Sequence, residues 1–204
     1  MDKQTLENLE KEVENLSKDS GQTRVESLWH LENIVLKKQG EEGLKELKKI
    51  LEKLKIDYQS YRDKGNTQWM PTRTAIAIWL AATRLFGWTK EEIYEMGKIS
   101  VSYSPAAKIF LKYFLSLKRT LNHSVDKWGK IYTQGSLEIK ELDLKKQNGV
   151  ITLKNFPTHP IQCAFIKGML AKVIELSTSS KKVKVTETKC QTRGDNYHEF
   201  NFTW

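Results

Sequence analysis

The chain has 204 residues, a formal net charge of +9, a hydrophobic content of 39% and 10% aromatic residues. These values suit a folded domain with one sizeable core and exclude a disordered chain. The longest apolar run, residues 74–86, contains Arg84 and is too short for a membrane span, so we expect a core helix there. The charged N-terminus is unlike a secretory signal, and two cysteines without framework spacing indicate a reducing compartment. We therefore expect a cytoplasmic protein.

The positive charge is unevenly placed along the chain. Residues 1–100 contain 17 Lys/Arg and 17 Asp/Glu, whereas residues 101–204 contain 17 Lys/Arg and 8 Asp/Glu. A basic half suits nucleic acid, an acidic partner or an anionic ligand, and equally a solubilising lysine-rich surface. Most of these cations are Lys, which recognises phosphates and bases less specifically than Arg. Nucleic-acid binding is therefore disfavoured.

The first residues predict an amphipathic helix. Leu6, Leu9, Val13 and Leu16 follow a 3-4-3 spacing on a Glu/Lys-rich background. This stripe must be buried either on the parent domain or on a second copy of the chain. We expect an N-terminal helix within residues 1–20 and a single α+β domain over residues 24–204.

Four further helices are predicted before the first strand. Residues 25–31 suit the start of either a strand or a helix. Apolar spacing and capping residues then predict helices over residues 44–54, 72–86, 89–98 and 105–121. The helix over 72–86 begins after Pro71, ends at Gly87 and is apolar on most sides, so it should be buried.

After Trp128 the apolar period changes to that of strands. Residues 134–146 and 150–154 predict a hairpin that turns at Asn148-Gly149, with a bulge near Lys140-Glu141. A helix over 161–176 and a second hairpin follow. The fold class is therefore α+β, with N-terminal helices followed by an antiparallel sheet built as hairpin–helix–hairpin.

The second hairpin carries the residues with the most distinctive chemistry. Its strands, near 183–190 and 197–204, meet at Gly194-Asp195. Strict alternation places Glu187 on one face of the first strand and Cys190 on the other. Cys190 should lie close to His198, either as a core pair or as half of a metal site.

These residues resemble the closing motif of the vinyl-4-reductase domain. The motif is Cys, three residues, Gly-Asp, two residues, Cys, one residue, Phe, and here it reads Cys190, Gly194, Asp195, His198 and Phe200, with His in place of the second Cys. Cys163 and Gly168 resemble the cysteine-containing helix of that domain. Residues 85–97 resemble bacterial stand-alone relatives in the same superfamily, which also contains heme nitric-oxide/oxygen-binding sensors and small TRAPP subunits.

Membership in that superfamily implies a pocket between helices and sheet for a hydrophobic or heterocyclic small molecule. We expect its lining to include Trp69, Trp79, Phe110, Phe114, Phe165 and Met169, although packed core is the simpler role for each. Members of the superfamily commonly form dimers. Together with the apolar stripe of the N-terminal helix, this resemblance predicts a homodimer. The expected function is a non-enzymatic ligand-binding or sensor domain. The alternatives are a dimeric scaffold without ligand, a basic nucleic-acid-binding protein and a reductase-type enzyme.

Two cofactors can be weighed from the sequence. His159, Cys163, Cys190 and His198 form a mixed N/S set that suits tetrahedral zinc, although buried cysteines often serve only as small hydrophobes. Heme is disfavoured, because the Tyr-x-Ser-x-Arg pattern at residues 58–62 resembles the propionate clamp of the heme sensors but comes too early in the chain.

Common catalytic motifs are missing from the sequence. There is no P-loop, no Gly-x-Gly-x-x-Gly, no nucleophile elbow and no His-Glu-x-x-His. Cys163 lies four residues after His159 at a predicted helix start, where a thiol could be activated, but a structural thiol is the more common case. No residue is therefore assigned a catalytic role.

Overall fold

A computed structural model of the chain describes residues 1–16, 18, 21–65, 67–103 and 116–204. It contains two compact units, Met1–Thr89 and Lys90–Trp204, and each is considered by itself. Within the described residues, no helix is both long and apolar enough to cross a membrane.

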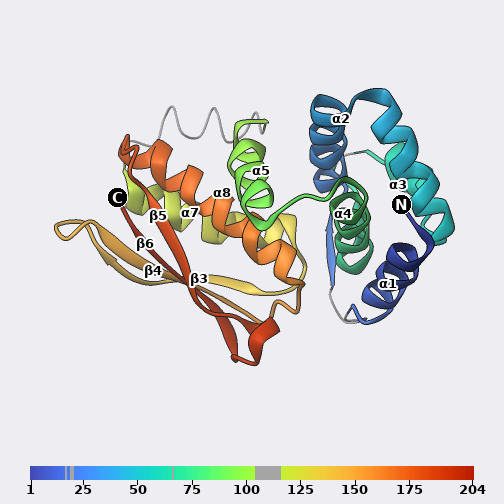
Figure 1. The fold of residues 1–204 in the computed structure, drawn as a ribbon. Coiled ribbons are helices and arrows are strands. Elements are labelled where there is room, and N and C mark those ends of the chain that lie inside the picture. The colour runs from blue at the N-terminus through green and yellow to red at the C-terminus, as the bar shows by residue number, and fades with distance from the viewer. Residues whose placement is uncertain (17, 19–20, 66, 104–115) are drawn as a thin grey trace. The chain divides into compact units, whose positions relative to one another are not determined.

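The first unit is mostly helical (Figure 1). Its elements are α1 (Lys3–Glu14), β1 (Gln22–Arg24), α2 (Glu26–Lys53), α3 (Tyr58–Asp63), β2 (Trp69–Pro71) and α4 (Thr72–Phe86). The strands β1 and β2 form a short antiparallel pair. As predicted, α4 is buried over most of its length and ends at Gly87, which has a left-handed φ of 66°.

The apolar stripe of α1 is buried within this first unit. Leu9 is 1% exposed and Leu16 is 8% exposed, and α1 contacts α4. Arg73 of α4 donates to the carbonyls of Val13 and Glu14 at the end of α1. Of the two alternatives for the stripe, burial on the parent unit is therefore the one observed. The packing of α1 onto α4 places residues 1–20 in the same compact unit as α4.

The helix α2 is longer than the sequence indicated. Residues 25–31 belong to its start rather than to a strand, and it continues to Lys53 through a kink at Gly40. Gly40 has φ 69° and ψ −171°, a conformation that glycine adopts readily. The kink explains why the apolar pattern appeared to begin only after residue 43.

The second unit contains a four-stranded antiparallel sheet. Its elements are α5 (Lys90–Tyr103), α7 (Leu117–Ile131), β3 (Ser136–Asp143), β4 (Asn148–Lys154), α8 (Pro160–Thr178), β5 (Lys184–Lys189), a 3-10 turn (Gln191–Arg193) and β6 (Tyr197–Thr203). The strand order is β3-β4-β6-β5, which confirms the α+β class. Most of the predicted helix 105–121 lies outside the described residues. The described part is α7, which is capped by Ser116 and extends to Ile131.

Helices α7 and α8 cover one face of the sheet, and α5 lies on the other side of α8 (Figure 1). At the crossing of α5 and α8, a Cβ atom on Gly168 would lie 1.9 Å from the carbonyl oxygen of Tyr94. A Cβ atom on Gly97 would lie 2.1 Å from the carbonyl oxygen of Phe165. The two glycines let the backbones approach closely, so α8 is buried on two sides.

The β3–β4 hairpin confirms the predicted bulge but turns earlier than expected. The register shifts between Ile139 and Glu141, which keeps the apolar side chains on the core face. The turn lies between Asp143 and Asn148, and the Asp143 carboxylate accepts hydrogen bonds from the backbone of Lys145 and Lys146. The prediction of a turn at Asn148-Gly149 was wrong. Gly149 lies within β4, where a Cβ atom would meet the ring of Phe202 at 2.4 Å.

Candidate metal centre

The 3-10 turn between β5 and β6 holds Cys190 in a fixed loop. The backbone N–H of Cys190 donates to Asp195 Oδ2 at 2.7 Å, and the backbone N–H of Asp195 donates back to the carbonyl of Cys190 at 3.2 Å. Gly194 closes the turn with φ 95°, a conformation that a residue with a side chain rarely adopts. The Gly-Asp pair of the sequence motif therefore positions the cysteine backbone.

A bulge in β5 brings a carboxylate to the same face as this thiol. Glu187 is paired with Phe200, but Lys189 is paired with Glu199, so one extra residue, Thr188, interrupts the alternation. Beyond the bulge, Cys190 faces the same side as Glu187. His198, two residues before Phe200 on β6, also faces this side.

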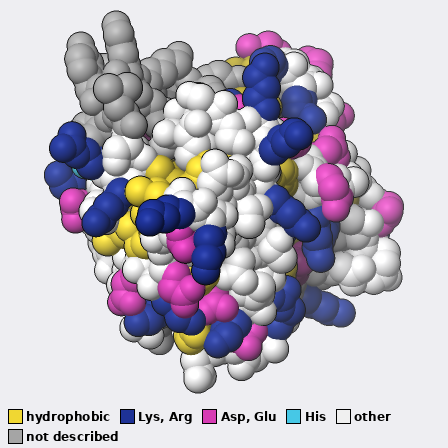
Figure 2. Space-filling model, turned by 90° about the vertical axis from the view of Figure 1, so that its left-hand side faces the viewer, with side chains coloured by type: hydrophobic (Ala, Val, Ile, Leu, Met, Phe, Trp, Pro, Cys, Tyr) yellow, Lys and Arg dark blue, Asp and Glu magenta, His cyan; other side chains and the backbone are white. Residues whose placement is uncertain are grey.

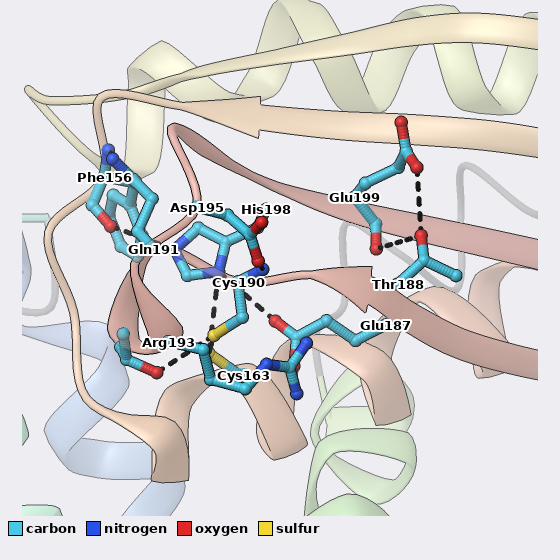
Figure 3. Close-up of polar contacts among 11 residues, drawn as sticks. Phe156, Cys163, Glu187, Thr188, Cys190, Gln191, Arg193, Asp195, His198 and Glu199 are labelled. Carbon is cyan, nitrogen blue, oxygen red and sulfur yellow. Dashed lines mark hydrogen bonds and ion pairs between the residues drawn. The ribbon is translucent and has the colours of Figure 1, made fainter.

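The first turn of α8, the helix that covers this face of the sheet, contributes Cys163 (Figure 3). Its Sγ lies 3.6 Å from Cys190 Sγ and 3.7 Å from His198 Nδ1. His198 Nδ1 lies 3.2 Å from Glu187 Oε1. One donor atom from each of Cys163, Glu187, Cys190 and His198 lies within 4.8 Å of every other. Both cysteines are free thiols, as predicted, and the predicted closeness of Cys190 and His198 is confirmed.

Two of the three separations above fall in the range of the edges of a zinc tetrahedron, and the third is slightly shorter. With Zn–S bonds of about 2.3 Å and Zn–N or Zn–O bonds of about 2.0–2.2 Å, two ligand atoms are roughly 3.3–3.8 Å apart. The three separations above are 3.6, 3.7 and 3.2 Å. Two thiols, one imidazole and one carboxylate form a donor set that zinc accepts.

The groups around the cluster orient its donor atoms. His198 Nε2 lies 3.3 Å from the carbonyl oxygen of Phe156, which directs the Nδ1 lone pair toward the thiols when Nε2 carries the proton. Thr192 Oγ1 lies 2.9 Å from Cys190 Sγ. Arg193 Nη1 lies 3.8 Å from Glu187 Oε2, the carboxylate oxygen turned away from His198. A second layer of contacts of this kind is typical of metal sites.

Burial and neighbouring groups shift the ionisation of two members of the cluster. Burial raises the pKa of the Cys163 thiol well above its usual value, and the Glu187 carboxylate and Cys190 add to the shift. Burial also acts to raise the pKa of Glu187, but hydrogen bonds from His198, Cys190 and Cys163 together bring it below its usual value. Without a metal, the site therefore pairs a neutral Cys163 thiol with an ionised Glu187.

The structure brings together three of the four residues that the sequence suggested as ligands. His159 is placed differently, because it caps α8 and its Nδ1 accepts a hydrogen bond from the backbone of Ile161. Glu187 is the fourth member of the cluster in place of His159. The sequence did not predict it, because strict alternation puts Glu187 on the opposite face of the strand from Cys190. The sequence of β5 gives no clear signal of the β-bulge. Half-buried and exposed side chains alternate without interruption from Lys184 to Lys189.

The six residues of the predicted ligand pocket divide between the two units. In the first unit, Trp69 lies on β2 with the Arg24 guanidinium 3.6 Å from its ring centre, and Trp79 is buried in α4. In the second unit, Phe165 and Met169 are half-buried on α8. Phe110 and Phe114 lie outside the described residues. The pocket therefore remains a prediction.

Comparison with solved structures shows the fold of this chain. An H-NOX protein from Shewanella oneidensis in the Fe(II)NO state matches with a TM-score of 0.62 and 12% identity, covering 88% of this chain and 97% of that one. An unliganded Fe(II) H-NOX protein from K. algicida matches with a TM-score of 0.64 and 14% identity, covering 88% and 95%. The chain therefore has an H-NOX-like fold, in line with the heme-NO-binding part of the predicted superfamily.

The sequence comparison matches a family other than the H-NOX proteins. Residues 4–86 match the family model of peptidyl-tRNA hydrolase PTH2, which spans less than half of the chain and lies in the first unit. This family differs from the vinyl-4-reductase domain that the closing motif resembles. A search of curated proteins finds no match.

Three of the four histidines have side-chain contacts with other groups of the protein. His30 Nε2 lies 3.6 Å from Glu26 Oε1, His159 caps α8, and His198 has both ring nitrogens in protein contacts. His123 lies on α7, where burial and then Lys127 lower its pKa. An axial heme ligand needs a free imidazole nitrogen facing a deep apolar pocket, and both ring nitrogens of His198 are engaged by protein groups.

The Tyr-x-Ser-x-Arg segment is also engaged within its own unit. Tyr58 and Arg62 both donate to Glu32 Oε2, at 2.7 and 2.6 Å. The backbone of Ser60 donates to Asp57, which caps α3. These contacts support the interpretation that the match to a propionate clamp is a chance one.

Proposed function

We propose that this chain is a non-enzymatic, sensor-type binding domain for a small hydrophobic or heterocyclic molecule, and that its second unit is held together by a zinc ion. Cys163, Glu187, Cys190 and His198 are the proposed ligands. The observation that carries the proposal is the convergence of their four donor atoms within 4.8 Å.

Zinc would connect three separate parts of the second unit. Cys163 belongs to α8, Glu187 and Cys190 to β5 and the turn after it, and His198 to β6. The four residues span positions 163 to 198 and cannot form this set in the unfolded chain, so the free energy of metal binding is also folding free energy. The metal would act as a structural brace, since the proposed set supplies all four positions of a tetrahedral site.

The sensor part of the proposal rests on the fold. The structural neighbours include H-NOX proteins described in the Fe(II)NO ligation state and in the unliganded Fe(II) state. Fold alone does not select a ligand. We propose that the ligand is not held through His30, His159 or His198, because these side chains have the contacts described above.

A binding role is favoured over catalysis. A nucleophilic cysteine needs a lowered pKa, whereas burial raises the pKa of Cys163. The match to peptidyl-tRNA hydrolase PTH2 raises the alternative of hydrolysis in the first unit, but Glu32, Tyr58 and Arg62 there are engaged with one another. A peptidyl-tRNA cleavage assay tests this alternative, and turnover by the purified chain would support it.

Two further expectations remain proposals. The chain is proposed to act in the cytoplasm, where free thiols such as Cys163 and Cys190 stay reduced. It is also proposed to form a homodimer, although the α1 stripe no longer supplies a reason because it is buried on α4. Sedimentation equilibrium at tens of micromolar checks this proposal, and a monomer at that concentration would contradict it.

Native mass spectrometry of protein purified from cells, without added metal or chelator, tests the proposed function. We expect the intact chain to carry a mass increment of one zinc ion, with a further increment for a retained small molecule. The Cys163→Ala/Cys190→Ala variant is the matched control and should lose the zinc increment only. Wild-type protein that carries neither increment would contradict the proposal.

A further inference from the structure

The second unit has an end that lies opposite the metal centre. Four segments meet there: the start of α7, the β3–β4 turn, the loop from α8 to β5, and the residue after β6. The strand register brings these segments together, because Thr203 of β6 is paired with both Asn148 of β4 and Lys184 of β5. The metal ligands His198 and Cys190 belong to the opposite end of the same strands.

Seven cationic side chains are exposed at this end. They are Lys118 and Arg119 of α7, Lys145 and Lys146 of the β3–β4 turn, and Lys181, Lys182 and Lys184 of the loop before β5 and its first residue. The carboxylates on the same segments are mostly engaged. Asp143 accepts backbone hydrogen bonds in the turn and lies 3.9 Å from Nζ of Lys146, and Glu175 is paired with Lys172 at 2.8 Å.

Apolar side chains lie among these cations. Leu144, in the β3–β4 turn, is 56% exposed, and Leu176, in the last turn of α8, is 40% exposed. Val183 and Trp204 are only partly buried against the core. Figure 2 looks onto this side of the molecule and shows hydrophobic side chains gathered between Lys and Arg side chains. Exposed apolar groups rimmed by cations are typical of an interaction surface.

We propose that this end of the second unit binds the surface of a membrane that contains anionic lipids. Each Lys or Arg near such a surface is attracted by the negative potential of the anionic lipids. Leu144 and Trp204 would enter the boundary between headgroups and acyl chains, where tryptophan is favoured. The cations project from separate segments at one end of the sheet, so several can reach one flat surface together.

A membrane fits these residues better than a nucleic acid does. Six of the seven cations are Lys, a compact charge that suits diffuse attraction to many anions, whereas Arg is preferred for bidentate recognition of phosphates. The exposed leucines among them would gain nothing from contact with a phosphate backbone, but they would be buried by a lipid surface.

Vesicle flotation with the full chain tests the proposal. Vesicles of phosphatidylcholine alone are compared with vesicles that also contain phosphatidylserine, at about 0.1 M salt, where the screening length is roughly 10 Å. We expect binding only to the phosphatidylserine vesicles. The Lys145→Glu/Lys182→Glu variant should bind these vesicles more than about tenfold more weakly, because four charge units are changed near the surface.

The matched control is Lys37→Glu/Lys53→Glu, which changes the net charge equally at exposed positions of α2. It should bind like the wild type. Leu144→Ser should weaken vesicle binding about two- to fivefold, as expected for one lost apolar contact. Its control is Ile99→Ser, which changes an exposed apolar side chain of similar size and should leave vesicle binding unchanged. Absence of preference for phosphatidylserine, or equal loss in both double variants, would overturn the proposal. Tight binding to RNA or DNA without vesicle binding would overturn it as well.

Discussion

Each unit contains a buried or half-buried polar cluster, and the two clusters differ in how their charges are compensated. In the first unit, the Glu32 carboxylate accepts from Tyr58 and Arg62, and the Arg62 guanidinium lies 3.9 Å from the centre of the Trp29 ring. Burial, followed by the hydrogen bond to Glu32, raises the pKa of Tyr58, so the phenol stays a donor. Every charge in this cluster has a partner in the protein.

In the second unit, the cluster consists of two thiols, an imidazole and a carboxylate that contact one another. The neighbouring cation, Arg193, lies at the margin, 3.8 Å from Glu187 and 56% exposed. Lone pairs that converge in a buried place are costly unless a proton or a metal ion lies between them. The charges of the first cluster are compensated within the protein, whereas in the second cluster the proposed zinc ion would replace the protons that its members share.

Among the variants considered, loss of a metal ligand should lower the free energy of unfolding most. It should also distinguish the two clusters, because only the second is proposed to bind zinc. With free zinc at 1,000 times its dissociation constant, bound zinc adds about 4 kcal/mol to the free energy of unfolding. We expect Cys190→Ala to lose this amount together with about 1 kcal/mol of packing in the core. In excess EDTA, only the packing loss should remain.

Thermal unfolding of wild type and Cys190→Ala, each with zinc and with EDTA, measures this difference. A destabilisation of equal size in both conditions would assign Cys190 to packing alone. Destabilisation by EDTA in Cys190→Ala as large as in the wild type would place the metal elsewhere.

The first cluster should respond to mutation without any dependence on metal. Glu32→Gln removes the charge that accepts from Tyr58 and Arg62, and hydrogen bonds to charged groups contribute about 1.5–3 kcal/mol. Because Arg62 is partly exposed, we expect a loss of about 1–2 kcal/mol. Urea unfolding should give the same loss with zinc and with EDTA. A loss that differs between the two conditions would mean that the clusters are coupled.

The pH dependence of stability should sharpen the role of Glu187. Its pKa in the folded chain lies below its ordinary value of 4.5, so its contribution to stability is present above that pH and is lost as pH falls through the folded pKa. In EDTA, the wild-type melting temperature should therefore fall on acidification below about pH 4.5 more steeply than that of Glu187→Gln. Parallel curves for the two proteins would show that Glu187 is not specifically stabilised in its ionised form.

The smallest effect is expected at His159, the one suggested ligand that lies outside the cluster. His159→Asn keeps a side chain that can cap α8, and His159→Ala removes the cap at a cost of about 0.5–1 kcal/mol. Both variants should retain full zinc content by elemental analysis. Loss of zinc in both would restore His159 to the ligand set in place of Glu187.

Much of the fold could be predicted because its signals are local. The buried helix ending at Gly87, the bulge after Ile139 and the strands on both sides of Gly194 all follow from apolar period and turn residues. The turn at Asp143 was mislocated because Asn148-Gly149 has strong turn propensity. Phe202 of another strand requires Gly149 for packing, and that is a tertiary effect.

The candidate site was predictable only in part for a similar reason. Cys163, Cys190 and His198 have distinctive chemistry and stand in a recognisable motif. Glu187 reaches the same face through the bulge at Thr188, and a bulge depends on pairing with the next strand. His159 had the right residue type at the start of α8, but its backbone position there made it a cap.

Zinc K-edge X-ray absorption of the purified, metal-loaded chain tests the central claim most directly. The account predicts one zinc ion with a first shell of two sulfur atoms at about 2.3 Å and two nitrogen or oxygen atoms at about 2.0–2.2 Å. The sulfur shell should disappear in Cys163→Ala/Cys190→Ala. A zinc shell without sulfur in the wild-type chain, or a chain that takes up no zinc, would contradict it.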